Sequence, residues 1–217
     1  MNLKKWLNET NLVNSREQLD LSSFQLKNET SEIIHNKNLI IQSNAFYFLS
    51  QSLKKLFLNR NKINLIEMQT FQHLTHLETL TLDSNNLTAL DQNLFLNLFN
   101  LAHLSLKSNQ IIFIHPDSFQ TQVNLLELRL NQNRLTHLPL RCFDKLLKLK
   151  SLFLDQNHID YLDSSVSSSH FKSLENLDRL FMSNNQLTSV GEHAFSGLNK
   201  LTRLDLDNNH ISFIHTR

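Results

Sequence analysis

Hydrophobic residues recur along this chain at a fixed interval and are not gathered into a few long apolar segments. In the copy of the pattern that begins at Leu77, Leu80 and Leu82 flank one polar residue, which places both leucines on one face of a short predicted strand. The opening leucines of the copies are Leu53, Leu77, Leu101, Leu125, Leu149, Leu177 and Leu201, so the successive intervals are 24, 24, 24, 24, 28 and 24 residues. A period of this length is typical of a solenoid protein.

The second half of each copy supplies apolar residues for the return to the next strand. After Leu82 the pattern continues with Leu87, Leu90, Phe95 and Leu98. The residues at the phenylalanine position are Phe71, Phe95, Phe119, Phe143, Phe171 and Phe195. One coil cannot cover its own apolar face, whereas stacked coils can. The pattern therefore predicts a continuous buried column of leucine and phenylalanine.

An asparagine stands where the chain leaves each predicted strand. The seven residues are Asn61, Asn85, Asn109, Asn133, Asn157, Asn185 and Asn209. The side-chain amide both donates and accepts hydrogen bonds, so it can satisfy backbone groups that a turn leaves unpaired. Seven asparagines in register predict a buried amide ladder that links neighbouring coils.

These positions together give the pattern L-x-x-L-x-L-x-x-N-x-L-x-x-L-x-x-x-x-F-x-x-L, by which residues from about 28 to 217 resemble the leucine-rich repeat family in its 24-residue class. The resemblance implies an α/β solenoid of horseshoe shape. It implies a parallel β-sheet on the concave side and loops or short helical or 3₁₀ turns on the convex side. Members of the family mostly bind proteins through the concave strands, so the resemblance implies binding more than chemistry.

Residues 1–27 do not follow the repeat. We interpret them as an N-terminal cap, a helical segment followed by an extended one, because a solenoid needs a terminal unit that shields its first coil. A membrane-surface helix is the alternative, but polar residues dilute the basic pair Lys4 and Lys5.

Residues 28–217 form the predicted solenoid. Residues 28–52 are a degenerate first repeat with Ile33 at its strand position, and seven clear copies follow, the last of them incomplete. The segment Asp163–His170 lengthens the fifth copy on its return path. We interpret it as a tolerated surface loop, with a modification or contact loop as the alternative.

The last copy stops before a phenylalanine or closing leucine, which leaves the strand around Leu204–Leu206 as a predicted sheet edge. An unpaired edge is a template for pairing with another chain. We therefore expect the natural chain to continue or another molecule to cover this edge, and self-association is one such route.

The charge balance and the cysteine content indicate which partners and which cellular compartment to expect. Twenty-one Lys and Arg residues oppose 20 Asp and Glu residues, so no global field would recruit nucleic acid. One cysteine excludes an internal disulfide, and cysteine-free ends favour an intracellular, reducing compartment. There is no long apolar run for a membrane span and no Sec-type signal at Met1–Glu9. The amino-acid usage, rich in asparagine, lysine and phenylalanine, looks like that of an intracellular protein or of a bacterial effector exported into a host cell by a non-Sec route.

Catalytic and metal-binding chemistry finds no support in the pattern, so we expect no enzyme activity and no cofactor. Cys142 occupies a column of mostly small residues and is interpreted as a packed thiol without a partnered base. The 11 histidines are scattered without the spacing of metal ligands, and no phosphate loop or nucleophile motif occurs.

The residues between the inward leucines must point out of the sheet, so they predict the concave surface. Phe153 and Phe181 fall in one column of consecutive coils, about 5 Å apart. We predict them as the centre of a protein-binding site with Arg129 and Arg179 at its margins, because exposed aromatic residues and arginine are typical of binding hot spots. The same column adds Phe57 and Asp205. The alternative is that the two rings only stack on each other.

Three classes of function remain at this point. The favoured one is a non-enzymatic protein-interaction module that captures a partner on the concave face. The second is a substrate-recognition subunit of a ubiquitin ligase or another enzyme complex. The third is an extracellular ligand-recognition domain, to which the N-x-S/T sequons at Asn8, Asn28 and Asn86 give weak support.

Overall fold

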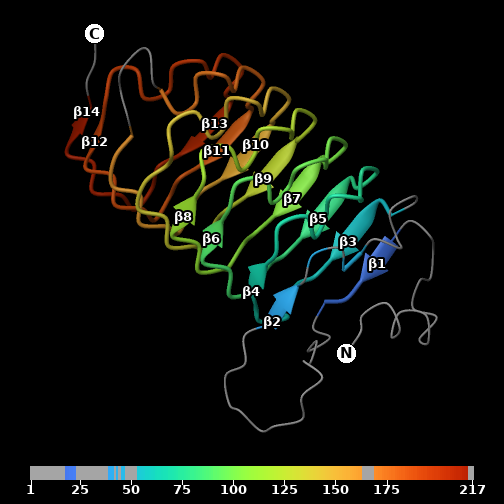
Figure 1. Ribbon diagram of the computed structural model, residues 1–217. Helices are drawn as coiled ribbons and strands as arrows, with labels where there is room; N and C mark the ends of the chain where they lie inside the picture. The colour runs from blue at the N-terminus through green and yellow to red at the C-terminus, as the bar shows by residue number, and fades with distance from the viewer. Residues whose placement is uncertain are drawn as a thin grey trace, which may run out of the picture.

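The chain winds into a curved stack of short coils. The structure, a computed structural model, describes residues 18–22, 39–41, 43, 45–46, 53–162 and 169–214. Figure 1 shows the coils lying side by side, with the first and last described strands at opposite ends of the stack. The predicted parallel-sheet solenoid is therefore confirmed.

One strand from each coil enters an eight-stranded parallel sheet, in the order β1-β3-β5-β7-β9-β10-β11-β13. Its strands are β1 (Gln18–Asp20), β3 (Lys55–Phe57), β5 (Thr79–Thr81), β7 (His103–Ser105), β9 (Glu127–Arg129), β10 (Ser151–Phe153), β11 (Arg179–Phe181) and β13 (Arg203–Asp205). Each strand has only three residues, because the next polar turn interrupts the alternation that a longer strand would need. We call the solvent-facing surface of this sheet the concave face.

The register of the sheet follows the leucines. Leu128 of β9 pairs with Leu152 of β10, which pairs with Leu180 of β11. All three side chains have 0 % exposure, while the next residues, Arg129, Phe153 and Phe181, are only partly buried. A shift of one residue would send these leucines to the solvent, so burial holds every strand in the same register.

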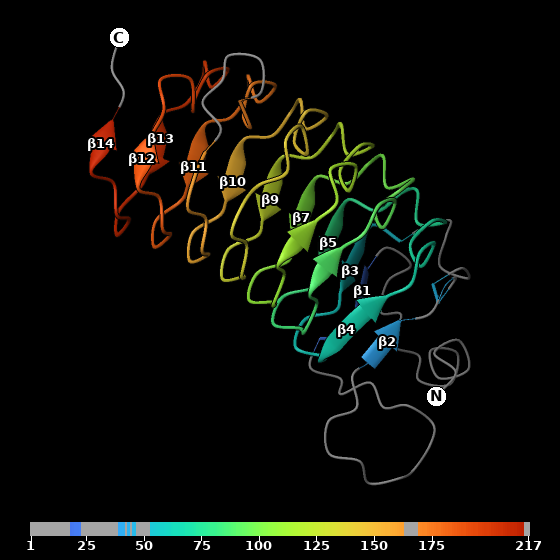
Figure 2. The ribbon, with the colours of Figure 1, turned by 60° about the vertical axis from the view of Figure 1, so that its left-hand side comes forward.

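Short strands also pair on the other side of the coils, which the sequence analysis did not predict. They form three two-stranded parallel sheets, β2–β4, β6–β8 and β12–β14 (Figure 1 and Figure 2). Their bounds are β2 (Leu39–Ile41), β4 (Ile63–Ile66), β6 (Ala89–Leu90), β8 (Phe113–Ile114), β12 (Ser189–Val190) and β14 (Phe213–Ile214). These pairs add backbone hydrogen bonds between coils where the family pattern implied only loops.

The predicted short helical or 3₁₀ turns are not found on the convex side of the described chain. The return path contains isolated turns, such as those in which Leu74 N–H donates to Phe71 O at 2.9 Å and Leu77 N–H donates to Leu74 O at 3.0 Å. Residues with positive φ interrupt this path, among them Asn97 (71°) and Arg141 (65°). A right-handed helix cannot pass through such a residue, so the turns stay separate.

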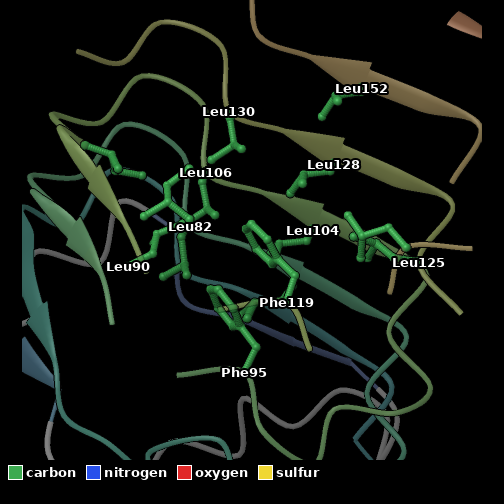
Figure 3. Close-up of a cluster of buried hydrophobic side chains, with 14 of the residues drawn as sticks. Leu82, Leu90, Phe95, Leu104, Leu106, Phe119, Leu125, Leu128, Leu130 and Leu152 are labelled. Carbon is green, nitrogen blue, oxygen red and sulfur yellow. The ribbon is translucent and has the colours of Figure 1, made fainter. Parts of the chain in front are cut away.

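The core lies between the main sheet and the return path. Figure 3 shows Leu104 and Leu128 of the sheet together with Phe95 and Phe119. The rings of Phe95 and Phe119 stack with centroids 6.0 Å apart, and the Phe119–Phe143 pair is separated by 6.3 Å. Burying one such large apolar side chain contributes about 1.5–3 kcal/mol, so a column repeated in each coil dominates the stability of the stack.

The seven asparagines named above form one column, and the six from Asn85 onward make the same set of hydrogen bonds. Asn133 shows the arrangement. Its Nδ2 donates to Leu130 O in its own coil at 2.9 Å and to Leu106 O in the preceding coil at 3.0 Å. Its Oδ1 accepts from Ile111 N–H at 3.0 Å. One side chain thus satisfies backbone groups in two coils, and we call the column the asparagine ladder.

The residue before each ladder asparagine adopts the left-handed conformation. Its φ is 56° at Ser108, 58° at Gln132 and 54° at Asn184. A non-glycine residue pays strain in this region, although asparagine tolerates it best. The turn keeps this strained conformation in each coil because the ladder and the core hold it in place.

The first coil differs from the others. The strand beside β3 is β1, which lies within the segment predicted as the cap, and Leu19 pairs with Leu56 in register. Leu19 and Leu21 are fully buried. Ile33 and the predicted helical segment of the cap lie outside the described residues, so the boundary at residue 28 stays a prediction.

The sheet ends at β13, where burial falls sharply. Leu204 is 39 % exposed, whereas Leu180 at the same position of the preceding coil has 0 % exposure. Ladder residue Asn209 is likewise only partly buried. Pairing of this edge with another molecule, including a second copy of the chain, stays a prediction.

The asparagine ladder yields a stability prediction. Replacing Asn133 by Leu removes the acceptor of Ile111 N–H from the middle of the stack. It also removes one of the two amide donors to Leu106 O and to Leu130 O, which keep only Asn109 and Asn157. Leaving such groups unsatisfied should lower the free energy of unfolding by about 1–3 kcal/mol, measured by urea denaturation.

Asn100→Leu is the matched control, because Asn100 makes one exposed bond to the preceding coil, from Nδ2 to Thr75 O at 2.8 Å. It should change the free energy of unfolding by less than ~0.5 kcal/mol. Equal effects of the two substitutions would contradict the role of the ladder.

Candidate functional site

The concave face is built from the first and third residues of each strand in the main sheet. The parallel register aligns Arg129 of β9 with Phe153 of β10, and Phe153 with Phe181 of β11. Asp205 of β13 follows beside Phe181. Because the register is fixed by buried leucines, these outward side chains are brought together without any contact of their own being required.

Four side chains form a continuous stack on this face, which we call the aromatic–cation stack: Arg129, Phe153, Phe181 and Arg203. The Phe153 and Phe181 rings are nearly parallel, with an interplanar angle of 8° and centroids 4.7 Å apart. The Arg129 guanidinium carbon lies 4.6 Å from the Phe153 centroid, and that of Arg203 lies 4.9 Å from the Phe181 centroid. Each ring therefore has a ring on one face and a guanidinium on the other.

Arg129 is held in place from its other side. Its Nε donates to Glu127 Oε1 at 2.7 Å, from the first residue of the same strand. The Arg129 side chain remains 40 % exposed. The ion pair orients the guanidinium over Phe153 and leaves its remaining N–H groups available to a ligand.

The role of Arg179 at the margin of the binding site stays a prediction, but another arginine stacks on Phe181. The Arg179 Nε lies 3.6 Å from Asp178 Oδ2, and the guanidinium over Phe181 belongs to Arg203. Arg203 is the first residue of the next strand and so reaches Phe181 diagonally. The sequence contained a signal for this contact, because Arg203 lies two residues before Asp205 and is therefore a diagonal neighbour of Phe181.

The two other predicted site residues lie at different distances from the stack. Asp205 is the register neighbour of Phe181. Phe57 lies on β3, where it pairs with Asp20 of β1 and Thr81 of β5. Three strands of the sheet order, β5, β7 and β9, separate β3 from β10, so Phe57 is not part of the stack.

Two carboxyl groups, those of Asp155 and Asp205, lie near the carboxyl ends of the strands that carry the stack. Burial raises the pKa of the Asp155 carboxyl above its ordinary value, and the nearby charge of Asp205 adds to this. The Asn131 amide and Lys107 act in the opposite direction. Asp155 therefore carries its charge on the concave face at an energetic cost, which a cationic group of a ligand would relieve.

Catalytic or metal-binding arrangements are not evident in the described chain. Cys142 is buried, and its burial and the charge of Asp144 raise the pKa of its thiol, which makes it a poor nucleophile. His170 is also buried, with Nε2 3.0 Å from Leu138 O. In the part of the chain that the structure describes, no three His, Cys, Asp or Glu side chains are placed to hold a metal ion. That part also contains no helix long and apolar enough to cross a membrane.

Comparison with known families agrees with the geometry. The leucine rich repeat family model matches residues 33–87, 75–122, 100–159 and 164–211, which together span most of the chain. The chain belongs to the leucine-rich repeat family. No curated protein matches the sequence.

Two solved structures show what this leucine-rich repeat chain is similar to. A chain in the crystal structure of the TLR13–ssRNA13 complex is 29 % identical, with a TM-score of 0.75 over 82 % of this chain and 24 % of that chain. A chain in the Drosophila Toll–Spatzle complex is 28 % identical, with a TM-score of 0.62 over 76 % of this chain and 25 % of that chain. The present chain thus spans about a quarter of the length of these solved chains.

The raised pKa of Asp155 generates a pH-dependent prediction. A carboxyl whose pKa is higher in the folded state than in the unfolded state stabilises the fold fully below its unfolded value. That contribution is lost as the pH rises through the folded value. Asp155→Asn should therefore raise the free energy of unfolding at neutral pH, and the gain should shrink as the pH approaches the ordinary value of 3.8. Urea denaturation at a series of pH values in this range measures the gain in the free energy of unfolding.

Asp160→Asn provides the control, since it removes the same charge from an exposed residue. A gain for Asp155→Asn that is equalled by Asp160→Asn, or that stays constant with pH, would exclude burial of Asp155 as the cause.

Proposed function

We propose that this leucine-rich repeat chain is a non-enzymatic protein-interaction module. It binds a partner protein on its concave face, with the aromatic–cation stack at the centre of the contact. The single observation that carries the proposal is the half-exposed stack of Arg129, Phe153, Phe181 and Arg203 on a sheet whose leucine core does not need it.

The physical argument rests on rigid exposed surface. Stacking each ring against a second ring and a guanidinium stabilises the arrangement by about 0.5–1.5 kcal/mol for the ring pair and about 0.5–1 kcal/mol for each cation–π contact. The four side chains are thereby ordered before a partner arrives, so little rotamer entropy is lost on binding. Ring edges and guanidinium N–H groups remain for the partner, and aromatic residues and arginine are the residues enriched at hot spots.

The alternative that the rings only stack on each other explains their order but not their position. A pair needed for stability alone would be better placed in the core, where burial contributes more. Here the pair stands on the outward surface between Asp205 and Arg129, where apolar area and opposite charges meet. That mixture is typical of a protein-recognition surface.

The solved relatives support a binding role but differ in ligand. One structure is a complex with single-stranded RNA, and the other is a complex of Toll with Spatzle. For this chain we favour a protein, because its net charge is only +1 and acidic residues accompany the stack on the concave face. The Asp155 and Asp205 carboxylates would repel a phosphate backbone.

The cellular setting belongs to the same proposal. The single cysteine, Cys142, is free and buried, which supports a reducing intracellular compartment, with export into a host cell as an effector as a further suggestion. A substrate-recognition subunit of a ubiquitin ligase and an extracellular recognition domain remain the alternatives. Mass spectrometry of partners captured from a cell lysate distinguishes these settings by the partners' own compartment.

The proposal predicts that binding and folding can be separated. A Phe153→Ala/Phe181→Ala double variant should lose at least ~2 kcal/mol of partner affinity, the scale of hot-spot truncation. Its thermal transition should fall by only a few degrees, because loss of the ring pair is worth about 0.5–1.5 kcal/mol and each kcal/mol shifts such a chain by about 2–4 °C. Calorimetric titration with the captured partner measures the affinity.

Phe113→Ala is the control, because it removes a phenylalanine ring that is 44 % exposed on β8, outside the main sheet. It should leave the affinity unchanged. If the double variant binds as tightly as the original chain, the stack is not the binding centre.

A further inference from the structure

A second feature lies at the amino ends of the strands that carry the aromatic–cation stack. It is a surface hollow of about 660 Å³, lined by Leu126, Lys148, Lys150, Asn176, Asp178 and Lys200. Three of its six lining residues are lysines, although the chain as a whole is nearly neutral. Neither the predicted site nor the stack includes any of them.

Two of these lysines are positioned by asparagines of the preceding coil. Lys148 Nζ donates to Asn124 Oδ1 at 2.8 Å, and Lys200 Nζ donates to Asn176 Oδ1 at 2.7 Å. The asparagines are themselves anchored, because each Nδ2 donates to a backbone carbonyl one coil further back at 2.8 Å. Each ammonium has three N–H donors and uses one here, so two remain for a ligand.

The one acidic residue in the hollow is already engaged. Asp178 Oδ1 accepts a hydrogen bond from Thr202 Oγ1, and its Oδ2 lies 3.6 Å from Arg179 Nε. None of the three lysines has an ion pair with Asp178 among the contacts of the described residues. The hollow therefore retains its positive charge at Lys148, Lys150 and Lys200.

The order of charges along the solenoid is specific. Lys148 and Lys200 occupy the same position in coils that are separated by one intervening coil, so they lie about 10 Å apart at the spacing of neighbouring strands. Asp178 belongs to the intervening coil. At the position of the two lysines this coil has the uncharged Asn176, and Asp178 follows two residues later. A peptide in the polyproline II conformation has three residues per turn and rises about 3.1 Å per residue, so side chains three residues apart point the same way and lie about 9 Å apart. Two carboxylates at that spacing match the two lysines.

We propose that this hollow binds an acidic peptide segment whose two carboxylates engage Lys148 and Lys200. The inference deepens the proposed function, on which it rests for the protein nature of the partner. It makes the hollow a second anchor beside the aromatic–cation stack. A nucleic acid fits less well, because its closely spaced phosphates would place negative charge opposite Asp178.

The test uses a synthetic peptide with two glutamates three residues apart in a neutral background. Its binding to the full chain is followed by NMR titration of backbone amides at physiological salt. The original chain should show saturable shifts at Leu126 and Asp178. Lys148→Gln/Lys200→Gln should weaken this binding roughly tenfold, which corresponds to about 1.4 kcal/mol. The same peptide with glutamines should bind no more tightly to the original chain than to this double variant.

Lys145→Gln/Lys172→Gln is the matched control, since both residues are exposed, lie outside the hollow and remove the same charge. It should reduce affinity less than twofold. Equal weakening by both double variants would show a general charge effect and overturn the proposal. Absence of saturable shifts at millimolar peptide, or tighter binding of an oligothymidylate at the same amides, would also overturn it.

The Phe153→Ala/Phe181→Ala variant separates this inference from the proposed function. It should bind the glutamate peptide as the original chain does, because the stack does not line the hollow. Loss of peptide binding in this variant would contradict an independent hollow. Conversely, retained peptide binding together with undiminished partner affinity would leave the hollow standing and remove the stack as the binding centre.

Discussion

The asparagine ladder is the interaction on which the rest of this molecule depends. Leucine burial alone drives the coils together, but burial has no direction and would tolerate small slips between them. The ladder adds direction, since each amide bonds backbone groups in its own coil and in the preceding one. Because those backbone groups are buried, a slip would leave them unsatisfied at about 1–3 kcal/mol each. Leucine burial excludes a shift of a strand by one residue, and the ladder excludes the smaller slips that burial tolerates, so the two together fix the register.

That register also builds the surface. Strands of only three residues are too short to hold a binding site individually, yet in register they bring Phe153 and Phe181 to 4.7 Å and place guanidinium groups on both outer ring faces. At the amino ends of the same strands, lysines and asparagines from successive coils line the hollow. The same repeat thus determines both the core and the surface. Both proposed binding features follow from residue differences at outward positions of neighbouring coils.

The sequence predicted those parts that repeat and failed where single contacts decide. Burial of leucine at each strand centre and the alignment of Phe153 with Phe181 follow from period alone. The stacking of Arg203, and not Arg179, on Phe181 does not follow from the period, because both arginines occupy the same column and only side-chain geometry distinguishes them. The absence of helical turns in the described return path depends on residues such as Asn97 and Arg141 with positive φ, which composition does not reveal. The hollow was missed because its lysines precede the strands.

Native-state hydrogen exchange tests the central role of the ladder most directly. The amides of Ile111 and Leu135 donate to the ladder oxygens of Asn133 and Asn157, both at 3.0 Å. If the ladder fixes the stack, these amides exchange only when the whole chain unfolds, and their opening free energy equals the global value. Exchange of these two amides at the rate of exposed convex turns, in a chain that is otherwise folded, would contradict the account.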